Sequence, residues 1–436
     1  MASHASSDRS WFVGSPELRA GRRFPPQLLM VNALYTDRRS SLDTAVPYAP
    51  EVSRGVRIKI LHVLSHLGLG GTETCALKVV NGLDSAEFEH AFCAVRKVDA
   101  AFASQIDRRT PILEAGSSRA GFQFPLFRLT RIMRSVRPHI VHSRNFGALE
   151  AVAAARLARV PLVVHSEHGY EIETMGGLPL RRRLVCRALY AMTDALFTVT
   201  DDLRRYHSNQ SWLDIEQFRV LPNGVDLERF MPRQNLAANL RTDLGIPTGR
   251  FVIGSVGRIV PIKDFRTLLR AAAILIGRGS DVHVLLVGEG PELGKLQTQV
   301  AETPELAGRV SFPGKSNRTA EFFNAMDVFV LPSLSEGMSN TVVEAMACGL
   351  PVAVTRVGGN PEVLGEGIAG ALFSPGDAPG LAELLSRYMT DSGFSQSVGA
   401  ACRSRAIEEF GLGRMLKQYG DLYKELAASR GIGTRN

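Results

Sequence analysis

Residues 57–83 read "RIKILHVLSHLGLGGTETCALKVVNGL" and contain the unit from which we predict the fold. A short apolar run is followed by a glycine-rich turn and by a helical apolar pattern that begins near Thr72. The unit returns around "HIVHSRN", "LVVHSEHG" and "ALFTVTDDLRRYH". Strands that alternate with helices favour a parallel sheet that is covered on both faces.

The alternation is interrupted at residues 218–232, "FRVLPNGVDLERFMP", and restarts with "FVIGSVGRIV", "VHVLLVGEG" and "DVFVLPS". We therefore predict an α/β fold of two doubly wound, Rossmann-like domains that face a central cleft. The predicted parts are a disordered or irregular extension at 1–55, a first domain at 56–225, a second domain at 226–410 and a C-terminal helix at 411–436 that packs back on the first domain.

Composition and charge limit the classes of protein. The 436 residues have a mean hydropathy of +0.01 and lack an apolar run near the ~18 residues of a membrane-spanning helix. The start, "MASHASSDRS", lacks the pattern of a secretory signal, so we expect a cytoplasmic protein. Five single cysteines without a C-x-x-C pair indicate reduced thiols rather than disulfides or zinc ligands. The net charge of +8 suits an anionic membrane or a phosphorylated substrate, whereas no sequence pattern supports nucleic acid.

Glycine-containing loops follow several of the predicted strands, at residues 68–71, 168–169, 257–258, 288–290 and 335–337. Ligands of doubly wound sheets bind outside the carboxyl ends of the strands, so we expect these loops to face the cleft. The first loop fails the dinucleotide fingerprint, because Glu73 stands where the third glycine belongs. Its backbone amides could still hold a phosphate or an acceptor.

Residues 335–351, "SEGMSNTVVEAMACGLP", place two glutamates eight positions apart. We predict a helix from Thr341, because Thr341 to Glu344 has the spacing of a capping box. The amino end of this helix and the small residues before it could bind a phosphate. Glu336 could bind a sugar hydroxyl, and Glu344 either caps the helix or binds a neutral diol such as ribose. A plain capping box with an exposed Glu336 is the alternative.

The segment "SVGRIVPIKDF" supplies cations for the same strand ends. Arg258 and Lys263 together could clamp a diphosphate, although either alone would be an ordinary surface charge. Three charge-assisted hydrogen bonds that strengthen on a leaving diphosphate would lower a barrier by roughly 5–9 kcal/mol. No aspartate is followed by another two positions later, so we expect no metal. Among the histidines, His168 in "SEHGYE" is the best candidate for substrate contact, although a lone histidine is more often structural.

These motifs together resemble glycosyltransferase family 4, whose members have the two-domain GT-B fold. The resemblance rests on "EGMSNTVVEAMACGLPV", "GRIVPIKD", "LPNGVD", "VGEGP", "EHG" and "GGTE", and it spans the chain from Arg57 to the last helices. It implies that a sugar is transferred, with retention and without a metal, from a nucleotide diphosphate donor bound mainly by the second domain. The first domain would hold the acceptor. The order of the motifs is most similar to that of sugar transferases from bacterial exopolysaccharide operons.

The resemblance also implies residue roles. Arg258 and Lys263 would neutralise the diphosphate, Glu344 would bind ribose, and the leaving phosphate itself would take the acceptor proton. The implied catalytic residues are Glu336, His168, Arg258 and Lys263. The implied donor-binding residues are Gly70, Gly71, Gly257, Arg258, Lys263, Gly290, Gly337, Met338, Ser339, Asn340 and Glu344. Asp264 and Thr74 depart from the Gly and Arg that are common in the family.

The implied partners are a nucleotide-sugar donor and a glycan or lipid-diphosphate acceptor of cell-surface polysaccharide synthesis, with no cofactor. The segments "FPLFRLTRIMRSVR" and "LPLRRRLVCRALYAM" set arginines beside apolar residues at helical spacing. This pattern predicts contact with an anionic membrane at its cytoplasmic face or with a lipid-diphosphate acceptor, with a solvated helix face as the alternative. Two other functions stay open: a nucleotide-sugar epimerase or sugar phosphorylase on the same fold, and a silent nucleotide-binding module.

Overall fold

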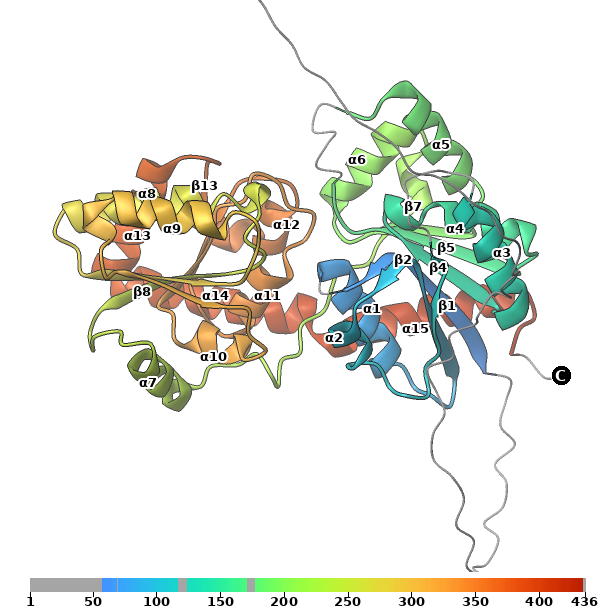
Figure 1. The fold of residues 1–436 in the computed structure, drawn as a ribbon, viewed down its shortest axis with the longest axis horizontal. Helices are drawn as coiled ribbons and strands as arrows, with labels where there is room; N and C mark the ends of the chain where they lie inside the picture. The colour runs from blue at the N-terminus through green and yellow to red at the C-terminus, as the bar shows by residue number, and fades with distance from the viewer. Residues whose placement is uncertain (1–56, 69, 117–123, 171–176, 434–436) are drawn as a thin grey trace, which may run out of the picture. The chain divides into compact units, whose positions relative to one another are not determined.

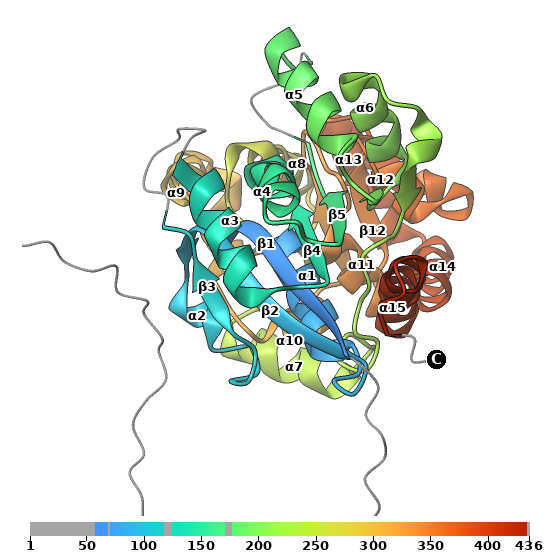
Figure 2. The same ribbon diagram turned by 90° about the vertical axis from the view of Figure 1, so that its right-hand side faces the viewer.

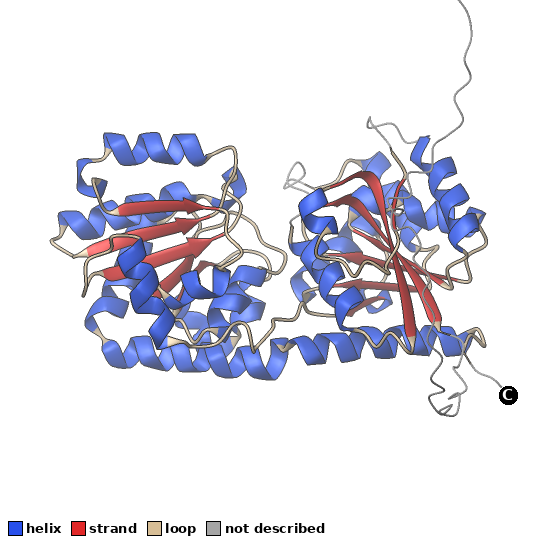
Figure 3. Ribbon diagram, turned by 60° about the horizontal axis from the view of Figure 1, so that its bottom comes forward, coloured by secondary structure: helices blue, strands red, loops and turns tan. Residues whose placement is uncertain are grey.

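The structure is a computed structural model that describes residues 57–68, 70–116, 124–170 and 177–433. The extension predicted at residues 1–55 lies outside the described residues. The described chain forms two parallel sheets, one of seven strands and one of six, with helices on both faces of each (Figures 1 and 3). This arrangement confirms the predicted α/β class with doubly wound sheets.

The first sheet has the strand order β3-β2-β1-β4-β5-β6-β7. All of its neighbouring strands pair in parallel. Its strands are β1 (Ile58–Leu67), β2 (Phe88–Val98), β3 (Ile112–Glu114), β4 (Ile140–Arg144), β5 (Leu162–Glu167), β6 (Ala195–Thr198) and β7 (Phe218–Val220). The central strands β4 and β5 are buried along their whole length, as expected of a sheet that is covered on both faces.

The helices around the first sheet follow its strands in turn. They are α1 (Gly71–Gly82), α2 (Ala100–Ala103), α3 (Phe124–Val136), α4 (Glu150–Leu157), α5 (Leu180–Tyr190) and α6 (Asp201–Ser211), with single 3-10 turns η1 (Phe146–Ala148) and η3 (Ile215–Gln217). Buried residues of α3, α4 and α5 pack on one face of the sheet, whereas α1 packs on the other.

The second sheet has the order β10-β9-β8-β11-β12-β13. Its strands are β8 (Phe251–Val256), β9 (Val282–Val287), β10 (Val310–Gly314), β11 (Val328–Leu331), β12 (Val352–Thr355) and β13 (Leu372–Phe373). Its helices are α7 (Gln234–Asp243), α8 (Phe265–Gly277), α9 (Leu293–Glu302), α10 (Thr319–Asn324), α11 (Asn340–Ala347), α12 (Asn360–Leu364), α13 (Ala378–Thr390) and α14 (Ser392–Phe410). Three 3-10 helices complete it: η4 (Pro261–Lys263), η5 (Pro304–Leu306) and η6 (Glu366–Ala371).

The last helix, α15 (Leu412–Ser429), belongs to the core of the first sheet. It lies beside α1 and β1, and its buried residues include Tyr419 and Tyr423 (Figures 1 and 2). The chain thus returns to its first sheet after completing the second. No helix within the described ranges is long and apolar enough to cross a membrane.

Candidate functional site

Lys263 and Glu336 meet at the carboxyl end of the second sheet. Lys263 ends the short helix η4 after β8, and Glu336 lies in the loop after β11. The Lys263 Nζ is 2.5 Å from the Glu336 Oε1, and the Ser333 hydroxyl donates to the same oxygen at 2.6 Å. The Leu334 backbone N–H donates to the carbonyl of Ile262 at 2.8 Å, which fastens the two loops together. The structure therefore brings together two residues that the sequence placed 73 positions apart.

The exposure of this pair rules out the simpler interpretation of Glu336. The side chains of Lys263 and Glu336 are only 15% and 10% exposed. Glu336 is therefore not an ordinary surface glutamate, because a nearly buried carboxylate needs the charge and hydrogen bonds that surround it here.

Gly337, the next residue, must be a glycine. A Cβ at this position would lie 2.7 Å from the carbonyl oxygen of His168 and 3.0 Å from the Cα of Gly169. The carbonyl of Gly337 also accepts a bond from the Thr200 hydroxyl at 3.4 Å. The loop that carries Glu336 is therefore packed backbone to backbone against the end of β5, where His168 lies.

His168 is held by two neighbours. Its backbone N–H donates to the Asn145 side-chain oxygen at 2.7 Å, and its Nε2 lies 2.9 Å from the Ser166 hydroxyl. Its Nδ1 is buried and has no hydrogen-bond partner among the described residues. Burial, and then the charge of Arg144, lowers the pKa of His168 to about 3. The ring is therefore neutral at physiological pH, so it can donate or accept a hydrogen bond but cannot supply a positive charge.

Arg258 follows β8 and is exposed. Burial raises the pKa of Glu73, at the start of α1, while the cations Arg258 and Arg144 pull it back. The charge of Arg258 therefore acts on the protonation of Glu73, which follows the glycine-rich loop of the first sheet. The adjacent Gly257 leaves no room for a side chain at Gly288, where a Cβ would lie 1.8 Å from the Gly257 carbonyl oxygen.

Gly290 has the same kind of close backbone contact. A Cβ there would lie 2.1 Å from the carbonyl oxygen of Ile259. The motif "VGEGP" therefore packs directly on the segment that carries Arg258, which explains why both positions are glycine.

The amino end of α11 carries the rest of the predicted site. The Asn340 side-chain oxygen accepts from the Asn223 amide at 3.0 Å, and its own amide donates to the carbonyl of Gly71 at 3.4 Å. The backbone N–H of Asn223 meets the sulfur of Met338 at 3.2 Å. These contacts join the "LPNGVD", "GGTE" and "EGMSN" motifs at one place. Gly70 is the residue before α1, so it also lies here.

The predicted capping box is wrong. The helix begins at Asn340, with Ser339 as its cap, and Ser339 makes no side-chain cap bond. Thr341 therefore lies inside the first turn, where its hydroxyl contacts the Ser339 hydroxyl at 3.1 Å instead of a backbone N–H. The first N–H groups of α11 are consequently not occupied by the side chain that the sequence pattern had assigned to them.

Glu344, one turn into α11, is the second glutamate of the motif. Burial raises its pKa to about 7, against the opposing charges of Lys78 and Arg229. Because it takes no part in a cap, it stays available for the neutral diol that the sequence suggested. A carboxyl group with a pKa of about 7 changes its protonation state near neutral pH.

Sequence reasoning missed two residues that shape this site. Asn145 follows β4 with a φ of +59°, and its amide donates to the Thr72 hydroxyl at 3.0 Å while its oxygen holds His168. Glu362 accepts from the backbone N–H groups of Asp201, at 2.9 and 2.7 Å, and of Asp202, at 3.3 Å. The position of Asn145 directly after a buried strand could have identified it as a site residue. No sequence pattern pointed to Glu362.

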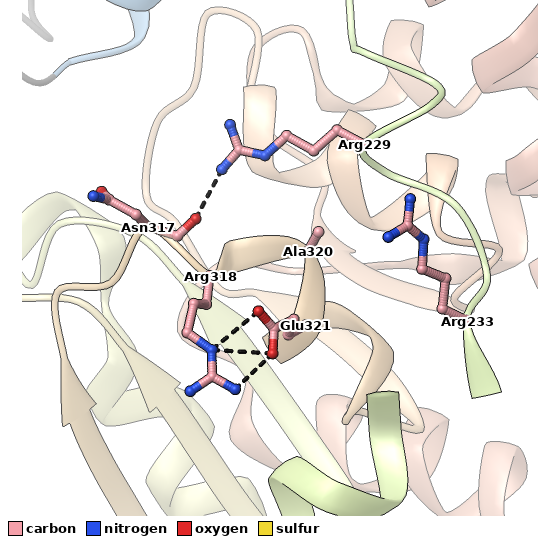
Figure 4. Close-up of a pocket in the computed structure, with 6 residues that line it drawn as sticks. All are labelled: Arg229, Arg233, Asn317, Arg318, Ala320 and Glu321. Carbon is pink, nitrogen blue, oxygen red and sulfur yellow. Dashed lines mark hydrogen bonds and ion pairs between the residues drawn. The ribbon is translucent and has the colours of Figure 1, made fainter. Parts of the chain in front are cut away.

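A pocket is lined by Arg229, Arg233, Asn317, Arg318, Ala320 and Glu321 (Figure 4). The charge of Arg229 also acts on Glu344. Arg318 is bonded to Glu321, and Arg229 donates to the Asn317 carbonyl at 2.9 Å. None of the predicted site residues lines it. Across the part of the chain that the structure describes, no group of three or more His, Cys, Asp or Glu could hold a metal ion.

Comparisons with known proteins give a family match for each of the two sheets. Residues 69–229 match the family described as "Glycosyltransferase Family 4", and residues 250–391 match "Glycosyl transferases group 1". A Bacillus subtilis protein named "Putative glycosyltransferase EpsF" is 32% identical over 312 residues, which cover 68% of this chain and 79% of that protein. An Escherichia coli UDP-Gal:alpha-D-GlcNAc-diphosphoundecaprenol alpha-1,3-galactosyltransferase is 27% identical, over 86% of this chain and 98% of that protein.

Solved structures share the fold. A glycosyltransferase from Rickettsia africae superimposes with a TM-score of 0.73 at 18% identity, covering 85% of this chain and 98% of its own. Anabaena Alr3699/HepE, solved in complex with UDP and glucose, also gives 0.73, at 20% identity, covering 85% of this chain and 100% of its own. Together with the two parallel sheets, these likenesses confirm the predicted fold.

Proposed function

Because this chain belongs to glycosyltransferase family 4, we propose that it transfers a sugar, with retention and without a metal, from a nucleotide diphosphate sugar to a glycan or lipid-linked acceptor. The observation that carries the proposal is the nearly buried Lys263–Glu336 pair at the carboxyl end of the second sheet. An ion pair at a strand end can exchange its internal contact for contacts with a ligand, because an incoming diphosphate can bind the lysine while a sugar hydroxyl binds the carboxylate.

The donor would bind chiefly to the second sheet. Arg258 and Lys263 would neutralise the diphosphate, and the N–H groups at the amino end of α11 would add hydrogen bonds to it. Glu344 would accept hydrogen bonds from the two ribose hydroxyls. Each of these contacts to the diphosphate strengthens as the leaving group gains charge, so they lower the barrier as well as the dissociation constant.

The sugar would lie between Glu336 and His168. Gly337 packs against the backbone of His168, so the two side chains come from adjoining loops. A neutral His168 can bond to a sugar hydroxyl without repelling the positive charge that develops on the ring. The leaving phosphate would take the acceptor proton. The acceptor would then attack the sugar on the same face from which the diphosphate departs, so the configuration at the anomeric carbon would be retained.

The acceptor is proposed from the relatives. The Escherichia coli relative is named for a lipid-linked acceptor, GlcNAc-diphosphoundecaprenol, and we propose an acceptor of this general kind, a glycan or a lipid diphosphate. Its pathway would be the synthesis of a cell-surface polysaccharide. Such an acceptor would bring the enzyme to the cytoplasmic face of the membrane.

The helices α3 and α5 supply the surface for such contact. Phe127 of α3 and Leu180 and Leu184 of α5 are 74%, 65% and 52% exposed. Arg131 is exposed on α3 as well. Arg128, in contrast, donates to the carbonyls of Ala115 and Gly116, so it serves the fold rather than a lipid. Arg134, Arg183 and Arg187 donate to backbone carbonyls in the same way. The proposed surface for an anionic bilayer therefore consists of the exposed apolar side chains together with Arg131.

Cosedimentation tests this membrane contact. We expect the full chain to bind vesicles that contain phosphatidylglycerol and not those of phosphatidylcholine alone, with binding that weakens in high salt. Phe127→Ser combined with Leu180→Ser should abolish binding. Ile407→Ser, which removes another exposed apolar side chain, serves as the control. Equal binding to both vesicle types would contradict the proposal.

The donor is tested by thermal stabilisation against a panel of nucleoside diphosphates and their sugars, with and without EDTA. One base should raise the melting temperature selectively, the shift should persist in EDTA, and it should be lost in Lys263→Ala. Product analysis with that donor then separates the activities. A free epimer or a sugar phosphate, formed without an acceptor, would replace the proposed transfer by an epimerase or phosphorylase reaction.

A further inference from the structure

A chain of buried polar contacts runs from the last helix to His168. The Tyr423 hydroxyl of α15 lies 2.7 Å from the His142 Nδ1, and the His142 Nε2 lies 2.9 Å from the Ser166 hydroxyl. The same hydroxyl lies 2.9 Å from the His168 Nε2. All four residues are buried, and each contact is of ordinary hydrogen-bond length. The chain of contacts ends at the His168 Nδ1, which is buried and has no partner in the part of the chain that the structure describes.

The direction of these bonds follows from the Tyr423 phenol. Among the described residues, its hydroxyl has one hydrogen-bond partner, the His142 Nδ1. A phenol that accepted from this nitrogen would leave its own buried proton without an acceptor, so the phenol donates to His142. His142 then accepts at Nδ1 and donates from Nε2 to Ser166, and the Ser166 hydroxyl donates to the His168 Nε2.

We propose that Tyr423, His142 and Ser166 are positioning residues that hold His168 in the tautomer with its proton on Nδ1. That nitrogen is then a donor without an acceptor, and a donor-sugar hydroxyl in the site would satisfy it. The identity of this ligand rests on the proposed function, but the tautomer does not. The last helix of the chain thereby sets the state of a side chain at the candidate site.

Two nearby tyrosines allow a matched test. Tyr419 lies one turn before Tyr423 on α15 and is equally buried. Within the described ranges, its hydroxyl has one hydrogen-bond partner, the Cys75 sulfur at 3.6 Å. Tyr423→Phe and Tyr419→Phe thus remove the same group from neighbouring positions. The histidine rings of the full-length protein, labelled with ¹⁵N, report the tautomer directly by NMR, with His168 assigned from the signal lost in His168→Gln.

The NMR experiment requires no enzyme activity. At pH 7 we expect protonated Nδ1 and unprotonated Nε2 in the wild type and in Tyr419→Phe, with a shift towards protonated Nε2 in Tyr423→Phe and in Ser166→Ala. A wild-type His168 protonated at Nε2, or an unchanged signal in Tyr423→Phe, would overturn the proposal. This result stands even if no sugar transfer is found, so a failure of the proposed function is recognised separately.

Kinetics give the second readout. Tyr423→Phe should lower kcat about tenfold, which is the effect expected when a residue that orients a site residue is removed. The kcat of Tyr419→Phe should stay near that of the wild type. In a His168→Ala background, Tyr423→Phe should have no further effect, because its influence passes through His168. An equal loss in both backgrounds would show a general structural effect of the tyrosine and refute the positioning role.

Discussion

Lys263 and Glu336 neutralise one another across 2.5 Å, although they come from loops that follow two different strands of the second sheet. Each side chain keeps most of its surface out of water, so each needs the other when no ligand is present. A diphosphate that binds Lys263 would release Glu336 towards the sugar. The two residues of the pair would thus contact the two parts of the proposed donor, Lys263 the diphosphate and Glu336 the sugar.

Removing one partner should expose this dependence. Lys263→Ala leaves the Glu336 carboxylate with the Ser333 hydroxyl, and we expect a stability loss of about 1–3 kcal/mol in denaturant unfolding. Nucleotide affinity should fall roughly tenfold to a hundredfold by calorimetry, which corresponds to one lost charge-assisted bond. Lys295→Ala is the matched control, because Lys295 forms an ion pair with Glu292 but is 60% exposed. Unchanged affinity in Lys263→Ala would contradict the proposed clamp.

Glu344 should make stability depend on pH. Its pKa is raised from 4.5 to about 7 in the folded protein. Between these values the folded state binds more protons than the unfolded state, so the free energy of unfolding falls as pH rises. Relative to Glu344→Gln, the wild type should lose stability on the order of 1–3 kcal/mol between pH 5 and pH 8. Thermal melts across this range measure it, with exposed Glu305→Gln as the control, and parallel curves would exclude the shift.

The same group should couple donor binding to a proton. Ribose hydroxyls donate to the ionised carboxylate, so binding favours the charged form of Glu344. We expect nucleotide affinity to increase from pH 6 to pH 8 by more in the wild type than in Glu344→Gln. The difference between the two proteins removes the titration of the phosphates themselves. If both show the same dependence, Glu344 does not contact the ribose.

His168 should act as a neutral group at every pH where the protein is folded. Its pKa is lowered to about 3, so no inflection of kcat between pH 5 and 8 should come from this ring. His168→Ala should lower kcat by a similar factor across the whole range. A loss that is confined to pH values below about 6.5, where an ordinary histidine is charged, would show that the ring works as a cation.

Gly337 should tolerate no side chain. A methyl group would meet the backbone of His168 and Gly169, so Gly337→Ala must displace one loop from the other. We expect transfer activity to fall by at least tenfold, as a shift of about 1 Å can cost a hundredfold. Gly294→Ala on α9 is the control, because a Cβ there meets nothing within 4 Å and alanine favours a helix. Full activity in Gly337→Ala would show that this close packing is dispensable.

Sequence patterns predicted the positions of the strands along the chain better than the contacts between them. The apolar runs of β1, β4, β5, β8, β9 and β11 were visible because a strand buried on both faces must be apolar. The start of α11 was predicted one residue late, since Thr341 and Glu344 have the spacing of a capping box but the turn before the helix places Ser339 at the cap. A local sequence pattern does not show at which residue the preceding turn ends and the helix begins.

The sequence by itself determined the α/β class, the strand-end loops and the residue types of the site, because periodicity and glycine positions are local properties of a chain. Only the tertiary structure decided that Lys263 pairs with Glu336, that Gly337 touches the backbone of His168, and that Tyr423 of the last helix is connected to His168. These contacts join segments up to 281 positions apart, such as His142 and Tyr423. They depend on how strands are ordered and where a helix returns, which is fixed by packing of the whole core rather than by any one segment.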